Sequence, residues 1–438
     1  MRTKILIAIL IQLGISNLVS AHSKDSTLIR SAQVSFFTPV GTNGMESHQY
    51  TNNISFNILA GYNGGIAGFE LAGLVNTLKY DMKGCQIAGI GNTVLGNVQG
   101  AQIGGIFNVN KLKTNGLQIG GISNYAKESD YLAQISGIAN VVLDTLIGVQ
   151  IGGITNVSEC VEGGLQIAGI ANVSAGEVIG SQISAITNTS EDNLLGLQIT
   201  GITNLSSGNT VGSQIAGIAN TTNGNLIGCQ IAGIANVCRD SLLGAQISFA
   251  NYAKHVKGMQ LGFINIADTF EQGVPVGFIS IVNKGGYRKL ELFTSETIYA
   301  GAKFKLGAPK FYNIFSIGGS QINSDYAWGF GYGIGSEVVR INKFSLNIDA
   351  LATQMTYNDV WSNHLSLVNT ISIYPTINIR KHLAFFIGLS FSAHVIERQY
   401  SEGVESFDKS FVPYSTVTYY SQNVLVKLYP GLTAGVRF

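Results

Sequence analysis

The chain has 438 residues and a net charge of +1, and its 12% of charged residues is about half the share usual in soluble proteins. With 45% hydrophobic residues, this balance excludes a disordered chain, and the scarcity of Glu, Lys and Arg excludes a coiled coil. The lack of basic runs argues against nucleic-acid binding, which needs a dense Lys and Arg footprint. What remains is a β-rich, exported and membrane-associated chain.

The N-terminus has the pattern of a secretory signal peptide. Arg2 and Lys4 form a basic start, an apolar segment covers residues 5–15, and Val19–Ala21 fits a small-residue cleavage site. The apolar segment is too short to span about 30 Å of bilayer hydrocarbon, which disfavours a membrane anchor. We therefore predict a cleaved signal peptide over residues 1–21.

Residues 22–65 form a short N-terminal region ahead of a repeat. Two alternating segments, near Ser31–Phe37 and Asn53–Gly61, predict strands in this region. We expect these strands to cap the repeat, or to add two strands to the C-terminal barrel described below.

A sixteen-residue repeat occupies residues 66–285. Its unit has the form G-x-Q-I-x-G-I-x-N, as in Gly164–Asn172. Leu132 and Ala185 are single departures from the two Gly positions, and Glu70 takes the Gln position one unit before the first Gln. The Gln recurs without a slip at positions 86, 102, 118, 134, 150, 166, 182, 198, 214, 230 and 246.

The repeat favours strands over helices, because Gly-rich units with β-branched Ile are poor helix formers. Sixteen is an even number, so every unit starts on the same face of the pleat. In a β-solenoid, identical residues stack about 4.8 Å apart, and buried amides form hydrogen-bonded ladders. In an antiparallel meander the strands would have about six residues, short of the 9–11 that cross a membrane. We predict a solenoid of sixteen-residue coils, with one large β-barrel that includes the repeats as the alternative.

The two ends of the repeat depart from its pattern, as terminal repeats usually do. At the first end, the sequence fits two interpretations of Glu70. Its side chain is either solvated on a less buried coil, or it caps the stack. At the other end Gln260 follows Gln246 after fourteen residues, and Pro275 lies where the repeat stops.

The C-terminal third, residues 286–438, has longer alternating segments, and the clearest of them covers residues 344–353. Its apolar face holds Phe344, Leu346, Ile348, Ala350 and Ala352. Its polar face holds Ser345, Asn347, Asp349 and Thr353. Apolar-out, polar-in alternation is typical of a transmembrane β-barrel, with a soluble antiparallel sheet as the alternative. We predict up to eight strands in an antiparallel outer-membrane-type barrel, whose interior is filled or holds one small ligand.

The connections between these strands alternate in length, as in outer-membrane barrels. Short links are expected at 307–310, 340–343 and 380–382, and longer ones at 320–327, 356–364 and 397–429. Aromatic residues near the strand ends predict interfacial girdles: Tyr299, Tyr312, Tyr326, Trp328, Tyr357 and Trp361. The segment 397–420 carries charged and aromatic residues, which makes it the best candidate for binding a partner.

The last residues alternate up to a terminal Phe, as Leu432, Ala434, Val436 and Phe438. This pattern resembles the C-terminal strand that the barrel-assembly machinery reads in Gram-negative outer-membrane proteins. The resemblance implies outer-membrane lipid and that machinery as partners.

The Q-I-x-G-I-x-N units, together with Asn53–Tyr62, resemble a family of bacterial surface-repeat proteins. Phe311–Phe315 resembles a segment of its Gram-negative members. The resemblance covers about residues 30–320 and implies export to the cell surface. It brings no catalytic residues that might be carried over to this chain.

The residues with chemical potential do not form a recognisable site. Cys85, Cys160, Cys229 and Cys238 make no CxxC and have no His at zinc-like spacing, although the last two fit a disulfide in an oxidising periplasm. The six His residues are scattered. Gly329–Gly335 alternates Gly within a strand and lacks the strand–turn–helix context of a nucleotide-binding loop. We predict no catalytic, cofactor-binding or metal site, and no cofactor.

We conclude from the sequence that the chain is a non-enzymatic outer-membrane or cell-surface repeat protein. A barrel anchor over residues 286–438 carries the array of residues 66–285 as a structural or binding scaffold for a surface ligand or protein partner. A porin-like channel and a secreted adhesin are the alternatives. The side of the membrane that holds the array depends on the parity of the barrel strands, which the sequence leaves open.

Overall fold

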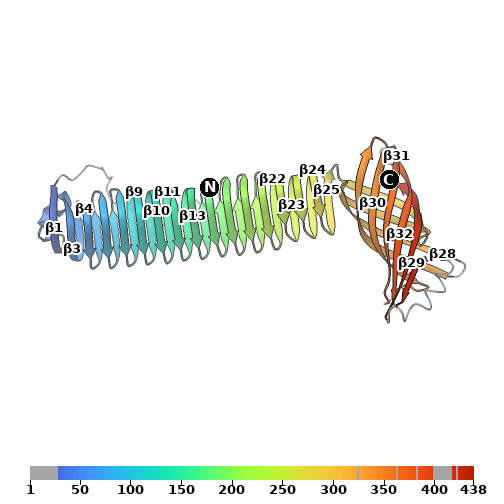
Figure 1. The fold of residues 1–438 in the computed structure, drawn as a ribbon. Coiled ribbons are helices and arrows are strands. Elements are labelled where there is room, and N and C mark those ends of the chain that lie inside the picture. Colours follow the sequence, from blue (N-terminus) through green and yellow to red (C-terminus); the bar gives the residue numbers. More distant parts are fainter. Residues whose placement is uncertain (1–27, 323–324, 362–363, 381–382, 398–416, 421–422) are drawn as a thin grey trace. The chain divides into compact units, whose positions relative to one another are not determined.

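The structure is a computed structural model that describes residues 28–322, 325–361, 364–380, 383–397, 417–420 and 423–438. The fold is all-β, with a β-solenoid of about 15 turns followed in the chain by an antiparallel sheet of eight strands (Figure 1). The predicted fold class is thereby confirmed. The predicted signal peptide lies outside the described residues. The chain divides into two compact units, Met1–Gly208 and Asn209–Phe438.

The first unit contains parallel strands of 4 to 14 residues, the two-residue strand β2, which pairs antiparallel with β1, and one short 3-10 helix. Its elements are β1 (Leu28–Phe37), β2 (Val40–Gly41), η1 (Gly44–Gln49), β3 (Tyr50–Asn63), β4 (Gly65–Ala72), β5 (Val75–Leu78), β6 (Met82–Ala88), β7 (Gly91–Val94), β8 (Val98–Gly104), β9 (Phe107–Gly120), β10 (Ser123–Ser136), β11 (Ala139–Leu146), β12 (Gly148–Gly152), β13 (Thr155–Ala168), β14 (Ala171–Ser174), β15 (Val178–Ser184), β16 (Thr187–Ser190), β17 (Leu194–Thr200) and β18 (Thr203–Ser206).

Equivalent positions of successive coils lie side by side in this unit. β13 pairs in parallel with β15 so that Gln166 lies opposite Gln182, and β14 pairs with β16 so that Asn172 lies opposite Asn188. Each regular coil therefore has a longer strand with the Gln, a tight corner, and a shorter strand with the Asn. Because the repeat strands are parallel, the alternative of one large antiparallel barrel is wrong.

The N-terminal segments belong to the same parallel stack. β1 pairs in parallel with β3, and β3 pairs in parallel with β4 and β5, which belong to the first repeat. This pairing extends the stack toward the N-terminus, and it differs from the antiparallel pairing that extra barrel strands would need.

Two ladders of buried amides run through the core of each unit with opposite polarity. The side-chain nitrogen of each Gln donates to the Gln of the preceding coil, as from Gln182 Nε2 to Gln166 Oε1 at 2.8 Å. The nitrogen of each Asn donates to the Asn of the following coil, as from Asn172 Nδ2 to Asn188 Oδ1 at 2.9 Å. All four of these side chains are fully buried. The hydrogen bonds satisfy polar groups that would otherwise be costly to bury.

Both Gly positions of the unit permit the close approach of neighbouring coils. A Cβ on Gly169, at the corner, would lie 2.1 Å from the carbonyl oxygen of Gly153, and a Cβ on Gly180 would lie 2.1 Å from that of Gly164. Gly180 also has a φ of +147°, which residues other than Gly rarely adopt. The first Gly of the unit is therefore required for its backbone conformation as well as for its contact with the preceding coil.

The coil that lacks the first Gly adjusts its backbone. Leu132 points into the core and is buried, and its neighbour Tyr131 takes the left-handed conformation with a φ of +50°. The register between β9 and β10 shifts between Ser129 and Leu132. The departure from the repeat is thus absorbed by one strained, exposed residue, and the ladders continue through Gln134.

The second unit contains the remaining coils and the antiparallel strands. Its elements are β19 (Thr210–Ala216), β20 (Ala219–Thr222), β21 (Leu226–Ala232), β22 (Ala235–Ile247), β23 (Ala250–Leu261), β24 (Ile264–Val276), β25 (Ile279–Lys284), β26 (Tyr287–Ser295), β27 (Ala300–Ala308), β28 (Phe311–Ile322), β29 (Asp325–Ile341), β30 (Phe344–Tyr357), β31 (Ser366–Arg380), β32 (Leu383–Glu397), β33 (Val417–Tyr420) and β34 (Val424–Arg437).

Eight antiparallel strands close into a barrel. β26 to β32 pair in chain order, β34 pairs with β32, and β34 also pairs with β26, where Arg437 lies opposite Glu291. β33 pairs with β34 outside this ring. Because the number of strands in the ring is even, the start of β26 and the end of β34 lie at the same end of the barrel. The array, which leads directly into β26, enters at that end.

The connections at the two ends of the barrel differ in length. At the array end, residues 309–310, 342–343 and 381–382 join successive strands. At the opposite end, residues 296–299, 323–324 and 358–365 and the long segment after Glu397 join them, so that two of these four links are short and two are long. The predicted long link at 320–327 is wrong, because β28 and β29 extend to within two residues of each other. We call the array end the short-turn end and the other the long-loop end.

Candidate functional site

The barrel interior near the short-turn end contains a buried cluster of charges. Lys305 Nζ lies 3.0 Å from Glu291 Oε1 and 2.6 Å from Asp349 Oδ2. Arg437 Nε lies 2.7 Å from Glu291 Oε1, and its Nη1 donates to Asn347 at 3.2 Å. The two cations and two carboxylates are at most 2% exposed. Such a cluster is stable only when each charge has a partner, as it has here.

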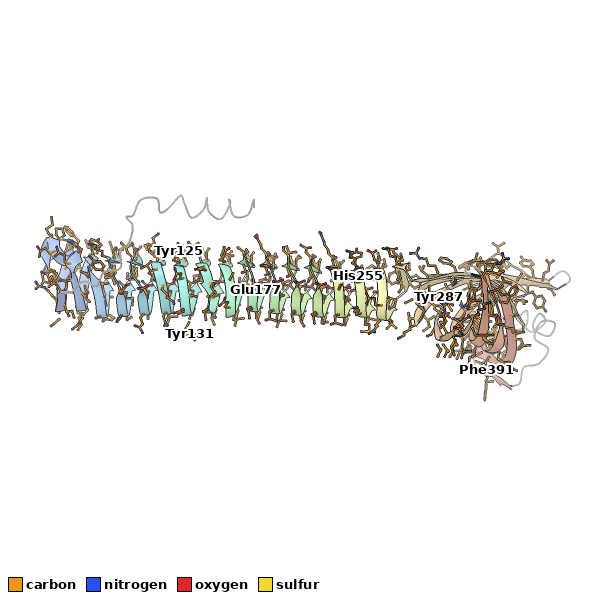
Figure 2. All side chains as sticks on the ribbon, turned by 90° about the horizontal axis from the view of Figure 1, so that it is seen from above. Tyr125, Tyr131, Glu177, His255, Tyr287 and Phe391 are labelled. Atoms are coloured by element: carbon orange, nitrogen blue, oxygen red, sulfur yellow. The ribbon has the colours of Figure 1, made fainter. Side chains whose placement is uncertain are left out.

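Three tyrosines complete this polar cluster. Tyr312 and Tyr374 donate their hydroxyl protons to Asp349, at 2.8 and 2.5 Å, and Tyr374 also bonds to Lys305. Tyr287 stacks on Tyr312 with ring centres 4.3 Å apart. The sequence placed Asp349 on the polar face of its strand, but it gave no reason to connect residues from six strands. Tyr287 lies at the barrel end next to the last coils (Figure 2).

Inward-facing glycines of β29 make room for this cluster. A Cβ on Gly335 would lie 2.3 Å from the ring of Tyr312 and 2.4 Å from Asp349 Oδ1. Gly329 and Gly333 leave similar room for Met355 and Leu351. The Gly329–Gly335 segment is therefore a barrel strand, which agrees with the prediction that it is not a nucleotide-binding loop.

The interior toward the long-loop end holds an apolar cluster beside buried polar side chains. The cluster contains Phe293, Ile298, Ala327, Met355, Tyr357, Val368, Tyr374, Phe386, Ile396 and Leu425. The buried polar side chains include Lys303, Thr353, Ser372, Ser390 and His394. A cavity of about 20 Å³ remains beside Lys303 and Glu296. A space of that size holds about one water molecule. The described part of the interior is thus packed, as predicted for a barrel of eight strands.

The outer wall of the barrel is apolar. The predicted alternation is confirmed in β30 and β34, where Phe344, Ile348 and Leu432 point outward and are 36–60% exposed, and Phe438, directly after β34, is 45% exposed. Phe391 lies on the outer side of the barrel (Figure 2). Other exposed apolar side chains on the wall are Leu290, Leu292, Phe304, Ile317, Phe330, Ile334, Ile371, Ile373, Ile377, Phe385, Ile387 and Leu389. An apolar wall around a charged interior reverses the arrangement of a water-soluble barrel.

The rim at the short-turn end is basic. The exposed cations there are Lys284, Arg288, Lys310, Arg340, Lys343 and Arg380. In the described part of the long-loop end, Asp325, Asp359 and Glu397 are exposed or half-buried. The short-turn end thus carries exposed cations next to the apolar wall.

The predicted aromatic girdles are only partly correct. Tyr299, Tyr326 and Trp361 are at least 40% exposed, in accord with the prediction. Tyr312 and Tyr357 instead point into the barrel and are buried. Their hydroxyl groups do not distinguish an interfacial position from a polar interior, so the sequence alone could not separate the two.

The repeat array contains one buried carboxylate, that of Glu70. Gln86 donates to its Oε2 at 2.7 Å, and Asn57 and Asn63 donate to its Oε1 at 3.0 and 2.6 Å. Glu70 is fully buried, so the interpretation of a solvated Glu70 is wrong. Burial raises the pKa of Glu70 to about 7, although the three amide donors favour the ionised form.

Glu70 supplies the acceptor that the end of the Gln ladder requires. Each Gln donates toward the preceding coil, so the first position must accept a hydrogen bond, and a carboxylate does only that when ionised. At the other end, Pro275 lies opposite Gln260 and provides no side-chain amide. Gln260 Oε1 is buried there without a partner.

The cysteines and histidines are not brought together. All four cysteines are free, and Cys238 is buried while Cys229 lies on the outward face of its strand, so these two do not form the disulfide that their spacing permitted. Burial raises the pKa of both thiols. Among the described residues, no group of three His, Cys, Asp or Glu side chains is placed to hold a metal ion. The segment 397–420, predicted to bind a partner, lies almost entirely outside the described residues.

Comparisons of the chain with protein families, curated proteins and solved structures found no match. The resemblance to a surface-repeat family therefore stays a prediction. Within the described part of the chain, no helix has both the length and the apolar character needed to span a bilayer. The function must be argued from the barrel and the array themselves.

Proposed function

We propose that the chain is a non-enzymatic outer-membrane protein in which the barrel is the anchor and the repeat array is the scaffold. The observation that carries this proposal is the inverted barrel, with charges inside and large apolar side chains outside. In water, the exposed wall would be costly at about 25 cal/mol for each Å² of apolar surface, whereas lipid covers it.

The packed interior favours an anchor over a porin-like channel. The four charges and three tyrosines fill the short-turn end, and the apolar cluster together with buried polar side chains fills the rest of the described interior. Barrels with aqueous channels have many more strands than eight. A secreted adhesin would leave the apolar wall without a function.

The closure of the barrel also supports one orientation. Outer-membrane barrels have short turns on the periplasmic side and long loops outside. The array enters at the short-turn end, as does the C-terminus at Phe438, whose backbone bonds to Leu290 on the first strand. We therefore place the array in the periplasm, on the side opposite to the surface exposure that the family resemblance implies.

Two measurements test the anchor. The protein should fractionate with the outer membrane, and its folded form should migrate faster than the heated form in SDS gels. Recovery in the soluble fraction, with no change of migration on heating, would exclude a membrane barrel.

Protease sites in two loops test the orientation. A site inserted after Ala175, in the turn between β14 and β15, should be protected in intact cells and cleaved once the outer membrane is permeabilised. A matched site after Asp359, at the long-loop end, should be cleaved in intact cells. The reverse pattern would place the array outside the cell.

A further inference from the structure

The coils of the second unit share one exposed apolar corner. The residue at this corner is outward-facing and 37–56% exposed in each coil. It lies four positions after Gln214 and Gln230, and three positions after Gln246, Gln260 and Pro275. We call these side chains the corner row: Ile218, Ile234, Phe249, Phe263 and Phe278. The row contains no charged or polar residue, and it changes from Ile to Phe in the three coils nearest the barrel.

The opposite edge of these coils is charged in the coils nearest the barrel. The charged residues there are Arg239, Asp240, Lys254, Lys257, Asp268, Glu271 and Lys284, whereas the variable segments 205–211 and 221–227 contain none. Ile227 and Leu243, which are 48% and 51% exposed, occupy the register position that Lys257 takes in the following coil. The coils from residue 235 onward are therefore amphipathic across their width, with charges at one edge and the corner row at the other. Amphipathic helices with such a division lie in the plane of a membrane interface.

The corner row continues directly onto the outer wall of the barrel. The rings of Phe249 and Phe263 stack at 5.1 Å between centres, and those of Phe263 and Phe278 at 4.9 Å. Phe278 then contacts Tyr332 at 4.7 Å and Phe315 at 5.6 Å. Both residues lie on the outer face of the barrel, which the proposed function places in lipid.

Polar contacts hold the last coil against the wall. The carbonyl oxygen of Gly277 accepts hydrogen bonds from Tyr332, at 3.3 Å, and from the Asn313 side chain. Arg288 on the first barrel strand donates to the carbonyl oxygen of Val282 at 3.1 Å. The corner and the opposite edge of this coil are thus both fixed to the barrel.

The register of the barrel strands shows which way this coil faces. Tyr287, where the polar edge enters the barrel, lies in one row with Gly307 and Tyr312, next to the short turn. Phe315 lies three residues further along β28, away from that turn. The corner row therefore meets the wall nearer the middle of the membrane than the polar edge does.

We propose that the corner row lies in the lipid of the leaflet at the short-turn end, so that the coils next to the barrel rest on the membrane rather than standing away from it. This inference rests on the proposed function. Phe side chains beside the basic rim match the aromatic and basic residues found at membrane interfaces. Exposed Ile also occupies this corner in the coils of the first unit, so the features that distinguish the coils next to the barrel are the three stacked Phe side chains and their continuity with the wall.

The test uses the full chain, folded into phosphatidylcholine vesicles that carry bromine on their acyl chains. The four cysteines are replaced by Ala, and a single cysteine carries a nitrobenzoxadiazole fluorophore at one of three sites. The sites are Phe249→Cys in the corner row, Arg239→Cys at the polar edge, and Phe391→Cys on the barrel wall. Ile234→Cys repeats the corner-row measurement at a position without a stacked ring.

Brominated lipid should quench the fluorophore at positions 249, 234 and 391, and aqueous iodide should quench it at position 239. Quenching by lipid at 391 but by iodide at 249 and 234 would overturn the inference and leave the anchor intact. Shielding of 249 and 234 from both quenchers would mean that another protein surface, such as a second copy, covers the row, which also overturns it. Iodide quenching at 391 would refute the anchor itself.

Discussion

The buried carboxylate at the start of the Gln ladder makes the stability of the first coils depend on pH. Glu70 has a pKa of about 7 in the fold against an ordinary value of 4.5. Each tenfold change in proton affinity is worth about 1.4 kcal/mol, so the difference corresponds to about 3 kcal/mol. The folded state binds the proton more tightly than the unfolded chain. The free energy of opening should therefore be highest below pH 4.5, fall as the pH rises to 7, and stay constant above it.

Hydrogen exchange measured by mass spectrometry at pH 5 and pH 8 tests this dependence, with rates corrected for the intrinsic effect of pH. For peptides covering residues 65–92, the free energy of opening should fall by most of the 3 kcal/mol between pH 5 and pH 8. The substitution Glu70→Gln should remove this dependence on pH. Glu177→Gln, in a turn of the same array, is the matched control and should keep it. If the Glu70→Gln protein retains the wild-type dependence, another group titrates and the reasoning is wrong.

Three further predictions concern the ladder, the charge cluster and the last residue. Gln166→Leu leaves an unpaired donor on Gln182 and an unpaired acceptor on Gln150, so opening of that coil should become easier by about 1–3 kcal/mol in hydrogen exchange. Ser181→Ala, at an outward-facing position, should leave the free energy of opening unchanged. Equal protection from exchange in the two variants would contradict a stabilising role of the Gln ladder. Lys305→Met leaves Asp349 buried without its cation, so the free energy of unfolding of the barrel should fall by about 3–5 kcal/mol. In SDS gels, the fast-migrating form should then be lost at a lower temperature. The double variant Lys305→Met with Asp349→Leu should be less destabilised than Lys305→Met alone. An equal loss of stability in the two variants would disprove the coupling between these residues. Deletion of Phe438 should reduce the amount of assembled barrel in cells but not its unassisted folding into vesicles. A loss in both would indicate that Phe438 is needed for packing of the barrel rather than for recognition by the assembly machinery.

The solenoid was predictable because its evidence is local and repeated. An even period keeps each Gln and Asn on one face, and only stacking gives such buried amides a partner of their own kind. The same reasoning did not reveal that the two ladders run in opposite directions. It also left the burial of Glu70 open, since that depends on Asn57 and Asn63 from a preceding strand outside the regular repeat.

The barrel was predictable as a pattern but not as a site. Alternation in 344–353 correctly assigned the apolar side chains to the wall and Asp349 to the interior. The contacts of Asp349 with Lys305 and Tyr374 join residues 44 and 25 positions away in the chain, and they depend on strand register and closure. The parity of the strands, which decides the end at which the array enters, likewise follows only from the pairing of β26 with β34.

The opposed amide ladders have a consequence for how the array can evolve. One Gln dipole and one Asn dipole of opposite direction enter with every unit, so their contributions along the stack largely cancel. Duplication or loss of sixteen residues leaves the acceptor at Glu70 and the terminator at Pro275 in place. Each event changes the extent of the stack by about 4.8 Å while every remaining coil keeps the neighbours it had. The number of coils in the scaffold is thus a trait that selection can adjust in fixed steps, independently of the residues at its ends.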